Sequence, residues 1–212
     1  MRTYLTEFIG TFFLVFTIGL TVIGGTPFAP LAIGTALMIM VYMGGHVSGA
    51  HYNPAVTLAL TMRGKLPGKD LVPYWISQIL GALVAAGAVK FITGKAFAPT
   101  PAADASSMAA LLVEVLFSFA LALVVLNTAT SAGTKGNSFY GLAIGSTITA
   151  AAFAGGPISG GAFNPAVGIG PTVVNALSGT GSYGHLWLYI VGPLAGAVLA
   201  SIVFGIQEQP TH

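Results

Sequence analysis

The sequence predicts an all-α membrane protein with six transmembrane helices, two re-entrant half-helices and an internal inverted repeat. The 212 residues are 55% hydrophobic and only 6% charged, with a mean hydropathy of +0.87. A soluble domain carries about 25% charged residues, so lipid is expected to surround most of this surface. Six apolar stretches are long enough to cross a bilayer. A motif containing Gly, Ser and Asn-Pro also occurs twice, 111 positions apart.

The composition excludes several classes of function. The net charge is +2, and the seven basic residues are scattered, so no nucleic-acid partner is expected. The chain has no cysteine, which excludes a disulfide framework, a thiol nucleophile and a cysteine-based metal site. His46 and His51 lack neighbouring residues with metal-ligand spacing. We therefore expect neither a metal nor a cofactor.

The apolar stretches give the spans in chain order. The six predicted spans are Leu5–Ile23, Leu31–Met43 with its apolar flanks, Leu71–Ile92, Met108–Leu126, Phe139–Phe153 with its flanks, and Leu186–Ile206. The first span contains Glu7 and no obvious cleavage site, so we interpret it as a retained span and not as a signal peptide. Two further apolar segments, Pro54–Met62 and Pro165–Leu177, follow an asparagine and are too short to span. They fit half-helices that enter the membrane and stop midway.

The repeated motif divides the chain into two related halves. It occupies Gly44–Val56 and again Gly155–Val167, and eight of its thirteen positions are identical. The halves cover approximately 1–95 and 107–206 within a single domain of residues 1–212. Each half holds three spans and one half-helix. Because three is odd, the second half enters from the opposite side of the membrane, and the half-helices approach the midplane from opposite faces.

The basic residues predict the orientation. With a cytoplasmic N-terminus, five basic residues lie on the cytoplasmic side and two on the other, as the positive-inside rule favours. The five are Arg2, Arg63, Lys65, Lys69 and Lys135, and the two are Lys90 and Lys95. We therefore expect cytoplasmic N- and C-termini in a plasma (cytoplasmic) membrane. The aromatic residues near the span entrances are interpreted as interface anchors, namely Tyr74, Trp75, Trp187 and Tyr189.

Asn53 and Asn164 each precede the proline that starts a half-helix. Asn is a favoured N-cap and Pro is favoured at the first helical position, so each side-chain oxygen is expected to cap its helix while the amide N–H groups point outward. Each helix start also carries about half a positive charge. Two such ends that meet at the midplane would pass neutral polar molecules and reject cations. A single Asn-Pro is a common turn signal, but two copies in register favour this interpretation.

The residues before each asparagine are rich in Gly and Ser. We expect Gly44–Tyr52 and Gly155–Phe163 to run extended, with their peptide carbonyls exposed in a row. Such backbone is tolerated at membrane depth only where it is buried in protein or lines a watery cavity. The two segments are therefore candidate pore linings.

These motifs resemble those of the aquaporin family, also called major intrinsic proteins. The resemblance covers nearly the whole chain and is strongest over Ser48–Thr57, Ser159–Ala166 and Thr6–Phe12. It implies an hourglass fold, a passive pore in every subunit, a homotetramer, and no enzymatic activity. It also implies that the loops are braced by two buried glutamates, Glu7 and Glu114. The implied carbonyl ladders are Gly49, Ala50, His51 and Tyr52 in the first half, and Gly160, Gly161, Ala162 and Phe163 in the second.

The resemblance also implies the positions of a selectivity filter, which are Ile33, Ala152, Gly161 and Val167. Most family members place Arg where this chain has Val167, and strict water channels usually have His where it has Ala152. This set has no charge, no side-chain donor and little bulk, which predicts a wide filter for water, urea, ammonia and hydrogen peroxide. The segment after the second motif is similar to tonoplast intrinsic proteins. Glycerol is the least expected solute, because the Arg-Asp that usually follows this motif in glycerol facilitators is missing.

Two alternatives remain open at the level of sequence. A secondary transporter also uses inverted repeats and broken helices. An intramembrane hydrolase could use Ser159 with His185, although Ser48 occupies the same place in the first motif and favours a role in loop architecture. Glu7 and Glu114 are intramembrane carboxylates and hence functional candidates. Their matched positions favour a scaffold over a proton relay.

Overall fold

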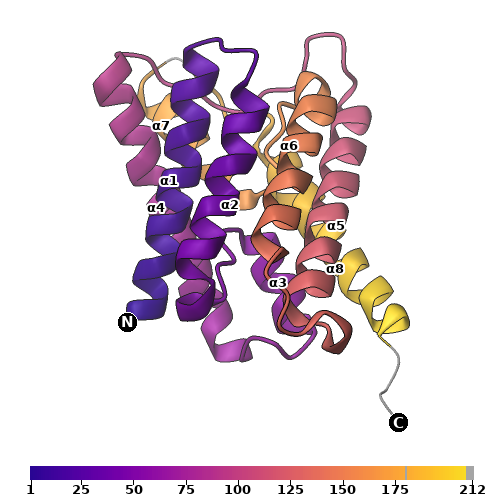
Figure 1. Cartoon of the computed structure of the whole chain (residues 1–212). Helices are drawn as coiled ribbons and strands as arrows, with labels where there is room; N and C mark the ends of the chain where they lie inside the picture. The colour runs from indigo at the N-terminus through magenta and orange to yellow at the C-terminus, as the bar shows by residue number, and fades with distance from the viewer. Residues whose placement is uncertain (180, 209–212) are drawn as a thin grey trace.

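The computed structural model describes residues 1–179 and 181–208, and all regular elements within these ranges are helical. Six of the helices are long and apolar enough to cross a membrane. They are α1 (Arg2–Ile23), α2 (Ala29–Ser48), α4 (Leu71–Thr93), α5 (Ser107–Thr130), α6 (Tyr140–Ser159) and α8 (Leu186–Gln207). They stand side by side and alternate in direction, with Met1 and the end of α8 on the same side of the bundle (Figure 1). The predicted fold class is confirmed.

Two short helices complete the bundle. These are α3 (Pro54–Met62) and α7 (Pro165–Leu177), with the bounds that the sequence predicts. They lie toward opposite ends of the bundle, and their N-terminal ends come together between the long helices (Figure 1). Two 3₁₀ turns lie in connections on the side of the termini, η1 (Gly68–Asp70) before α4 and η2 (Ala132–Thr134) after α5.

The prediction of extended backbone is wrong for the first part of each loop. Helix α2 continues to Ser48 and α6 continues to Ser159. In lipid a helix satisfies its own N–H and C=O groups, which outweighs the low helix propensity of glycine. Each helix ends only where a glycine takes the left-handed conformation, at Gly49 with φ 84° and at Gly160 with φ 87°. The N–H of each of these glycines closes the last turn by donating to a carbonyl four residues earlier, at 3.0 Å.

Glycines set the spacing between the two halves. Helices α2 and α6 cross at Gly34 and Gly145, where a Cβ on either residue would lie 2.5 Å from the carbonyl oxygen of the other. Within each half, Gly81 faces the backbone of α1 at Phe8 and Gly196 faces the backbone of α5 at Val115. Small residues allow this close approach in membranes. The same contact therefore recurs in both halves, as an internal repeat requires.

Candidate pore and filter

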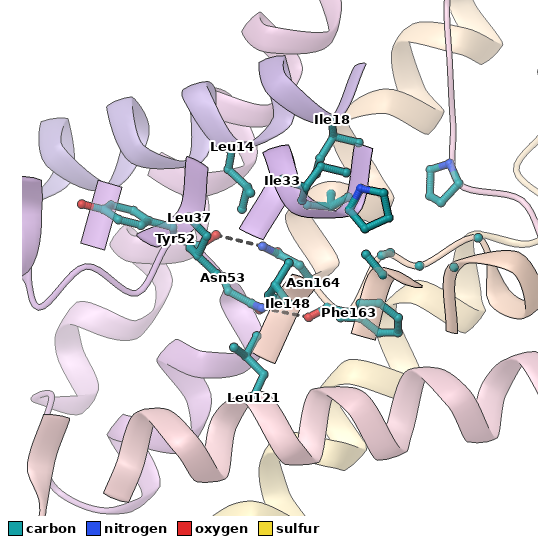
Figure 2. Close-up of a pocket in the computed structure, with 18 of the residues that line it drawn as sticks. Leu14, Ile18, Ile33, Leu37, Tyr52, Asn53, Leu121, Ile148, Phe163 and Asn164 are labelled. Atoms are coloured by element: carbon teal, nitrogen blue, oxygen red, sulfur yellow. Dashed lines mark hydrogen bonds between the residues drawn. The ribbon is translucent and has the colours of Figure 1, made fainter. Parts of the chain in front are cut away.

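The two half-helices meet through a reciprocal pair of hydrogen bonds. The Asn53 Nδ2 atom donates to the carbonyl oxygen of Phe163 at 2.9 Å, and the Asn164 Nδ2 atom donates to the carbonyl oxygen of Tyr52 at 2.9 Å (Figure 2). Each asparagine Oδ1 accepts from the backbone N–H two residues later and so caps its own helix. Both asparagines are almost fully buried, with 4% and 3% exposure. Each amide has a second N–H, which the crossing bond leaves for the cavity.

Glu7 holds the first loop from α1. Its Oε1 atom accepts from the Ser48 hydroxyl at 2.6 Å and from the His51 N–H at 3.0 Å. Its Oε2 atom accepts from the Tyr52 N–H at 2.7 Å and from Gln78 Nε2 at 2.8 Å. Four donors thus surround a fully buried carboxylate, which fixes the path of the backbone just before Asn53.

Glu114 holds the second loop from α5 in the same way. It accepts from the Ser159 hydroxyl at 2.8 Å, from the Ala162 N–H at 3.0 Å and from the Phe163 N–H at 2.6 Å. Ser159 is fully buried by this contact, whereas His185 is exposed at the start of α8. The serine hydroxyl therefore belongs to the loop architecture, as Ser48 does in the first half.

Two tyrosines that the sequence suggested as interface anchors are buried, so that interpretation is wrong for them. The Tyr74 hydroxyl donates to the Ser48 carbonyl at 2.7 Å, and the Tyr189 hydroxyl donates to the Ser159 carbonyl at 2.5 Å. Both serines end a helix, where the last carbonyls lack an intrahelical partner. The matching positions of Tyr74 and Tyr189 before Gly81 and Gly196 were the sequence signal for this role.

The two tryptophans differ from each other in their surroundings. The half-buried Trp75 donates from Nε1 to the Pro54 carbonyl at 2.9 Å and thus contacts the start of α3. Trp187 is 45% exposed on the outer surface of the bundle, as an interface anchor should be. Trp187 is thus the most exposed of the four aromatics.

A cavity of about 360 Å³ passes the two asparagines and opens at the end of the bundle away from the termini, which we call the distal mouth. Its wall is mostly aliphatic, with Leu14, Ile18 and Leu37 among the side chains that face it (Figure 2). The four positions expected to form the filter all line this cavity: Ile33, Ala152, Gly161 and Val167. None of them carries a charge or a side-chain hydrogen-bond donor.

A second cavity, of about 630 Å³, lies on the side of the termini, at what we call the terminal mouth. It shares the lining residues Val125 and Ile144 with the first cavity, so the two cavities are neighbours. Its lining is more polar and includes the side chains of His46, Lys65, Lys135 and Glu208. The two cavities lie one after the other along the bundle, each toward its own mouth.

The eight residues expected to form carbonyl ladders all line one or other of these cavities. Gly49 lines the terminal cavity, and the other seven line the distal one. The loops take an unusual backbone path, since Tyr52 and Phe163 have φ of 49° and 50°. A non-glycine residue adopts this conformation only where its surroundings hold it, and here the glutamates bind both N–H groups. Apart from the Tyr52 and Phe163 carbonyls, the ladder carbonyls accept no hydrogen bond from the described part of the chain.

Six membrane-crossing helices around two opposed half-helices, with a cavity at the point where these meet, define an integral multi-pass membrane channel. The arrangement contains a loop and a half-helix from each side of the bundle. The chain belongs to the major intrinsic protein family, whose sequence profile matches residues 1–204. Members of this family are channels, so the protein is an aquaporin-type channel for water and small solutes and not an enzyme.

The similarity to individual proteins spans nearly the whole chain. Aquaporin NIP1-1 of Zea mays is 37% identical over 216 residues, which cover 97% of this chain and 74% of that protein. The glycerol uptake facilitator protein-like 6 of Lactiplantibacillus plantarum is 38% identical over 211 residues, which cover 95% of this chain and 95% of that protein. The solved structure of the aquaglyceroporin from Plasmodium falciparum superimposes with a TM-score of 0.85 at 25% identity, over 96% of this chain and 94% of that one.

Proposed function

We propose that this channel has a wide apolar filter that passes water together with larger neutral solutes, namely urea, ammonia, hydrogen peroxide and glycerol. The observation that carries the proposal is the lining of the distal cavity. Ile33, Ala152, Gly161 and Val167 lie along one cavity with the asparagine pair and offer it no cationic side chain. A wide opening without a fixed charge selects solutes by size and by polarity less strictly than an opening with an arginine does.

The relatives support a place for glycerol among the solutes. By its name, one relative of matching length is a glycerol uptake facilitator-like protein, and the structural neighbour is an aquaglyceroporin. The sequence placed glycerol last because the Arg-Asp pair after the second motif is absent. A cavity lined by aliphatic side chains and backbone carbonyls still offers an amphipathic solute an apolar wall on one side and acceptors on the other.

The asparagine pair supports cation exclusion in the same proposal. Asn53 and Asn164 lie at the N-termini of α3 and α7, where the aligned peptides place about half a positive charge each. A water that passes accepts from the free N–H groups and turns its own hydrogens away from the pair. A cation would meet repulsion at the point where it has lost its hydration.

The test is osmotic light scattering on proteoliposomes that hold the wild-type protein or a Val167 variant. Wild type should pass water and the four solutes. Val167→Arg should lower urea and glycerol permeability at least about tenfold, because it adds both bulk and charge to the lining, with a smaller effect on water. Val167→Leu is the matched control, since it adds bulk without charge and should have an intermediate effect.

Two results would contradict the proposal. Equal loss of water and solute flux in Val167→Arg would mean that Val167 does not control the size of the passing solute. Uptake that saturates or requires an ion gradient would favour a secondary transporter, the alternative that inverted repeats allow.

We also propose that the channel is a homotetramer in a plasma (cytoplasmic) membrane, with cytoplasmic termini. Large apolar side chains such as Leu80, Phe91 and Leu116 are exposed around the bundle, which suits contact with lipid or with further copies. Five of the seven basic residues lie in segments near the terminal mouth, which supports a cytoplasmic position for this mouth.

A further inference from the structure

The connection between α4 and α5 contributes to the wall of the distal mouth. This loop runs over residues 94–106, and four consecutive residues of it line the distal cavity: Phe97, Ala98, Pro99 and Thr100. None of them belongs to the repeated motif or to the four filter positions. We call the four residues the mouth segment.

The mouth segment is anchored at its start by an aromatic side chain. Phe97 is 9% exposed and packs toward α1 and α4. A Cβ on Gly19 of α1 would lie 2.5 Å from the Phe97 ring and 2.8 Å from the Val89 side chain of α4. The missing side chain at Gly19 therefore makes room for Phe97, which fixes the loop against two helices.

The other end is tied to the second half of the protein. The Ala102 N–H donates to the Ile158 carbonyl in the last turn of α6, at 3.0 Å. A Cβ on Gly160 would lie 2.5 Å from the Thr100 nitrogen and 2.7 Å from its carbonyl oxygen. The backbone of Thr100 thus packs directly on the first residue of the second carbonyl ladder, and the segment is held across the mouth from both sides.

Thr100 is the one residue of the mouth segment with a polar side chain, and none of the four filter positions has one. The other polar side chains lining this cavity are His51, Tyr52, Asn53 and Asn164. Tyr52 donates its hydroxyl to the Met40 carbonyl, and His51 is hydrogen-bonded to Thr57. The Thr100 hydroxyl makes one bond within the described residues, a long contact of 3.5 Å to the Ala98 carbonyl. At this length the bond is weak and the hydroxyl remains able to bind a solute.

We propose that the mouth segment is a solute-selecting wall of the channel and that the Thr100 hydroxyl is its solute-binding group. The ligand class is a neutral molecule with hydroxyl or amide groups. The inference rests on the proposed function and deepens it. A solute loses water when it passes from the distal mouth to the apolar surface of Ile33, Ala152 and Val167. The hydroxyl returns one hydrogen bond at that step, as donor or acceptor, and so lowers the barrier for solutes more than for water.

The experiment compares Thr100→Val, which is nearly isosteric but lacks the hydroxyl, with Thr100→Ser, which keeps it. Proteoliposome assays with glycerol, urea and water are the readout. Thr100→Val should lower glycerol and urea permeability about three- to tenfold, as the loss of one hydrogen bond implies, while water permeability changes less than about twofold. Thr100→Ser should retain the wild-type values. Ser107→Ala, which removes an exposed hydroxyl near the same mouth but outside the cavity lining, is the matched control.

The outcomes separate the two proposals. Equal solute permeability in Thr100→Val and wild type, in vesicles where wild type conducts, would overturn the role of Thr100 and leave the channel function intact. The same loss in Ser107→Ala would also overturn it, because the effect would not depend on the cavity lining. A wild-type protein that conducts none of the solutes would overturn both proposals.

Discussion

Each midplane asparagine uses one small side chain in three ways. Its oxygen caps a half-helix, one N–H crosses to the opposite loop, and the second N–H remains for the cavity. Removing either Asn53 or Asn164 would release the loop of the other half as well. The side chains before them differ, since Tyr52 donates its hydroxyl to the Met40 carbonyl whereas Phe163 packs against the Phe117 ring. The two loops share a backbone path, and the packing around that path differs between them.

The variants Asn53→Asp and Asn164→Asp test whether the asparagine pair excludes cations. Each change places a carboxylate oxygen where Nδ2 now lies 2.9 Å from a carbonyl oxygen, and its negative charge offsets the positive end of the helix. We expect a proton or sodium leak above that of the wild type, measured with a pH-sensitive dye or a sodium indicator inside proteoliposomes.

Asn164→Ala is the control for the asparagine variants, since it removes the donor without adding charge and should leak less than Asn164→Asp. If neither aspartate variant leaks protons or sodium, the asparagine pair does not carry cation exclusion.

Some helical glycines lie at close helix crossings, whereas others have open space around them. Gly34 and Gly145 lie where α2 and α6 touch, with no room for a methyl group on either side. A Cβ on Gly87 of α4, by contrast, would meet no heavy atom of the described chain within 4 Å beyond its own helix backbone and chain neighbours. The same residue type therefore has different consequences in two helices of similar composition.

Gly34→Ala is expected to destabilise the protein by about 1–3 kcal/mol, because its methyl group would press on the Gly145 carbonyl and separate α2 from α6. Gly87→Ala is the matched control and should leave stability unchanged or slightly raised. Thermal unfolding in detergent measures both. Equal midpoints for the two variants would contradict a tight crossing at Gly34.

At the scale of the whole molecule, the two mouths differ although the halves repeat. The terminal mouth is lined by ionisable side chains that include Lys65 and Lys135, whereas the lining of the distal mouth has no charged side chain among the described residues. The linker between the halves has no counterpart within the repeat, and it covers the distal mouth alone. An inverted repeat thus produces a pore with chemically distinct ends.

We expect the termini of the channel to face the cytoplasm. This orientation is simple to measure with single cysteines, because the chain has none of its own. Lys95→Cys, near the distal mouth, should react with a membrane-impermeant maleimide added to intact cells. Lys135→Cys, at the terminal mouth, should react only after permeabilisation. The reverse pattern would place the termini outside. Both residues lie in connections between helices, so either substitution should leave the fold unchanged.

Much of the fold followed from local sequence. The bounds of α3 and α7 match the prediction to the residue, and an N-cap asparagine followed by a proline is the reason for both starts. The C-terminal ends of α2 and α6 were not predicted. The low helix propensity of glycine holds in water, whereas in lipid the backbone N–H and C=O groups must bond within the helix. The buried hydroxyls of Tyr74 and Tyr189 were missed because span edges usually place aromatic residues in the interface.

Local features of the chain were enough to predict that it crosses a membrane six times, repeats itself in inverted form and caps two half-helices with Asn53 and Asn164. Those features depend on apolar run length, on spacing and on capping, which are properties of neighbouring residues. Two contacts emerge only from the folded molecule: each asparagine crosses to the loop of the other half, and Thr100 lies on Gly160 at the distal mouth. Such contacts join residues far apart in the chain, and no local preference encodes which distant backbone a side chain will meet.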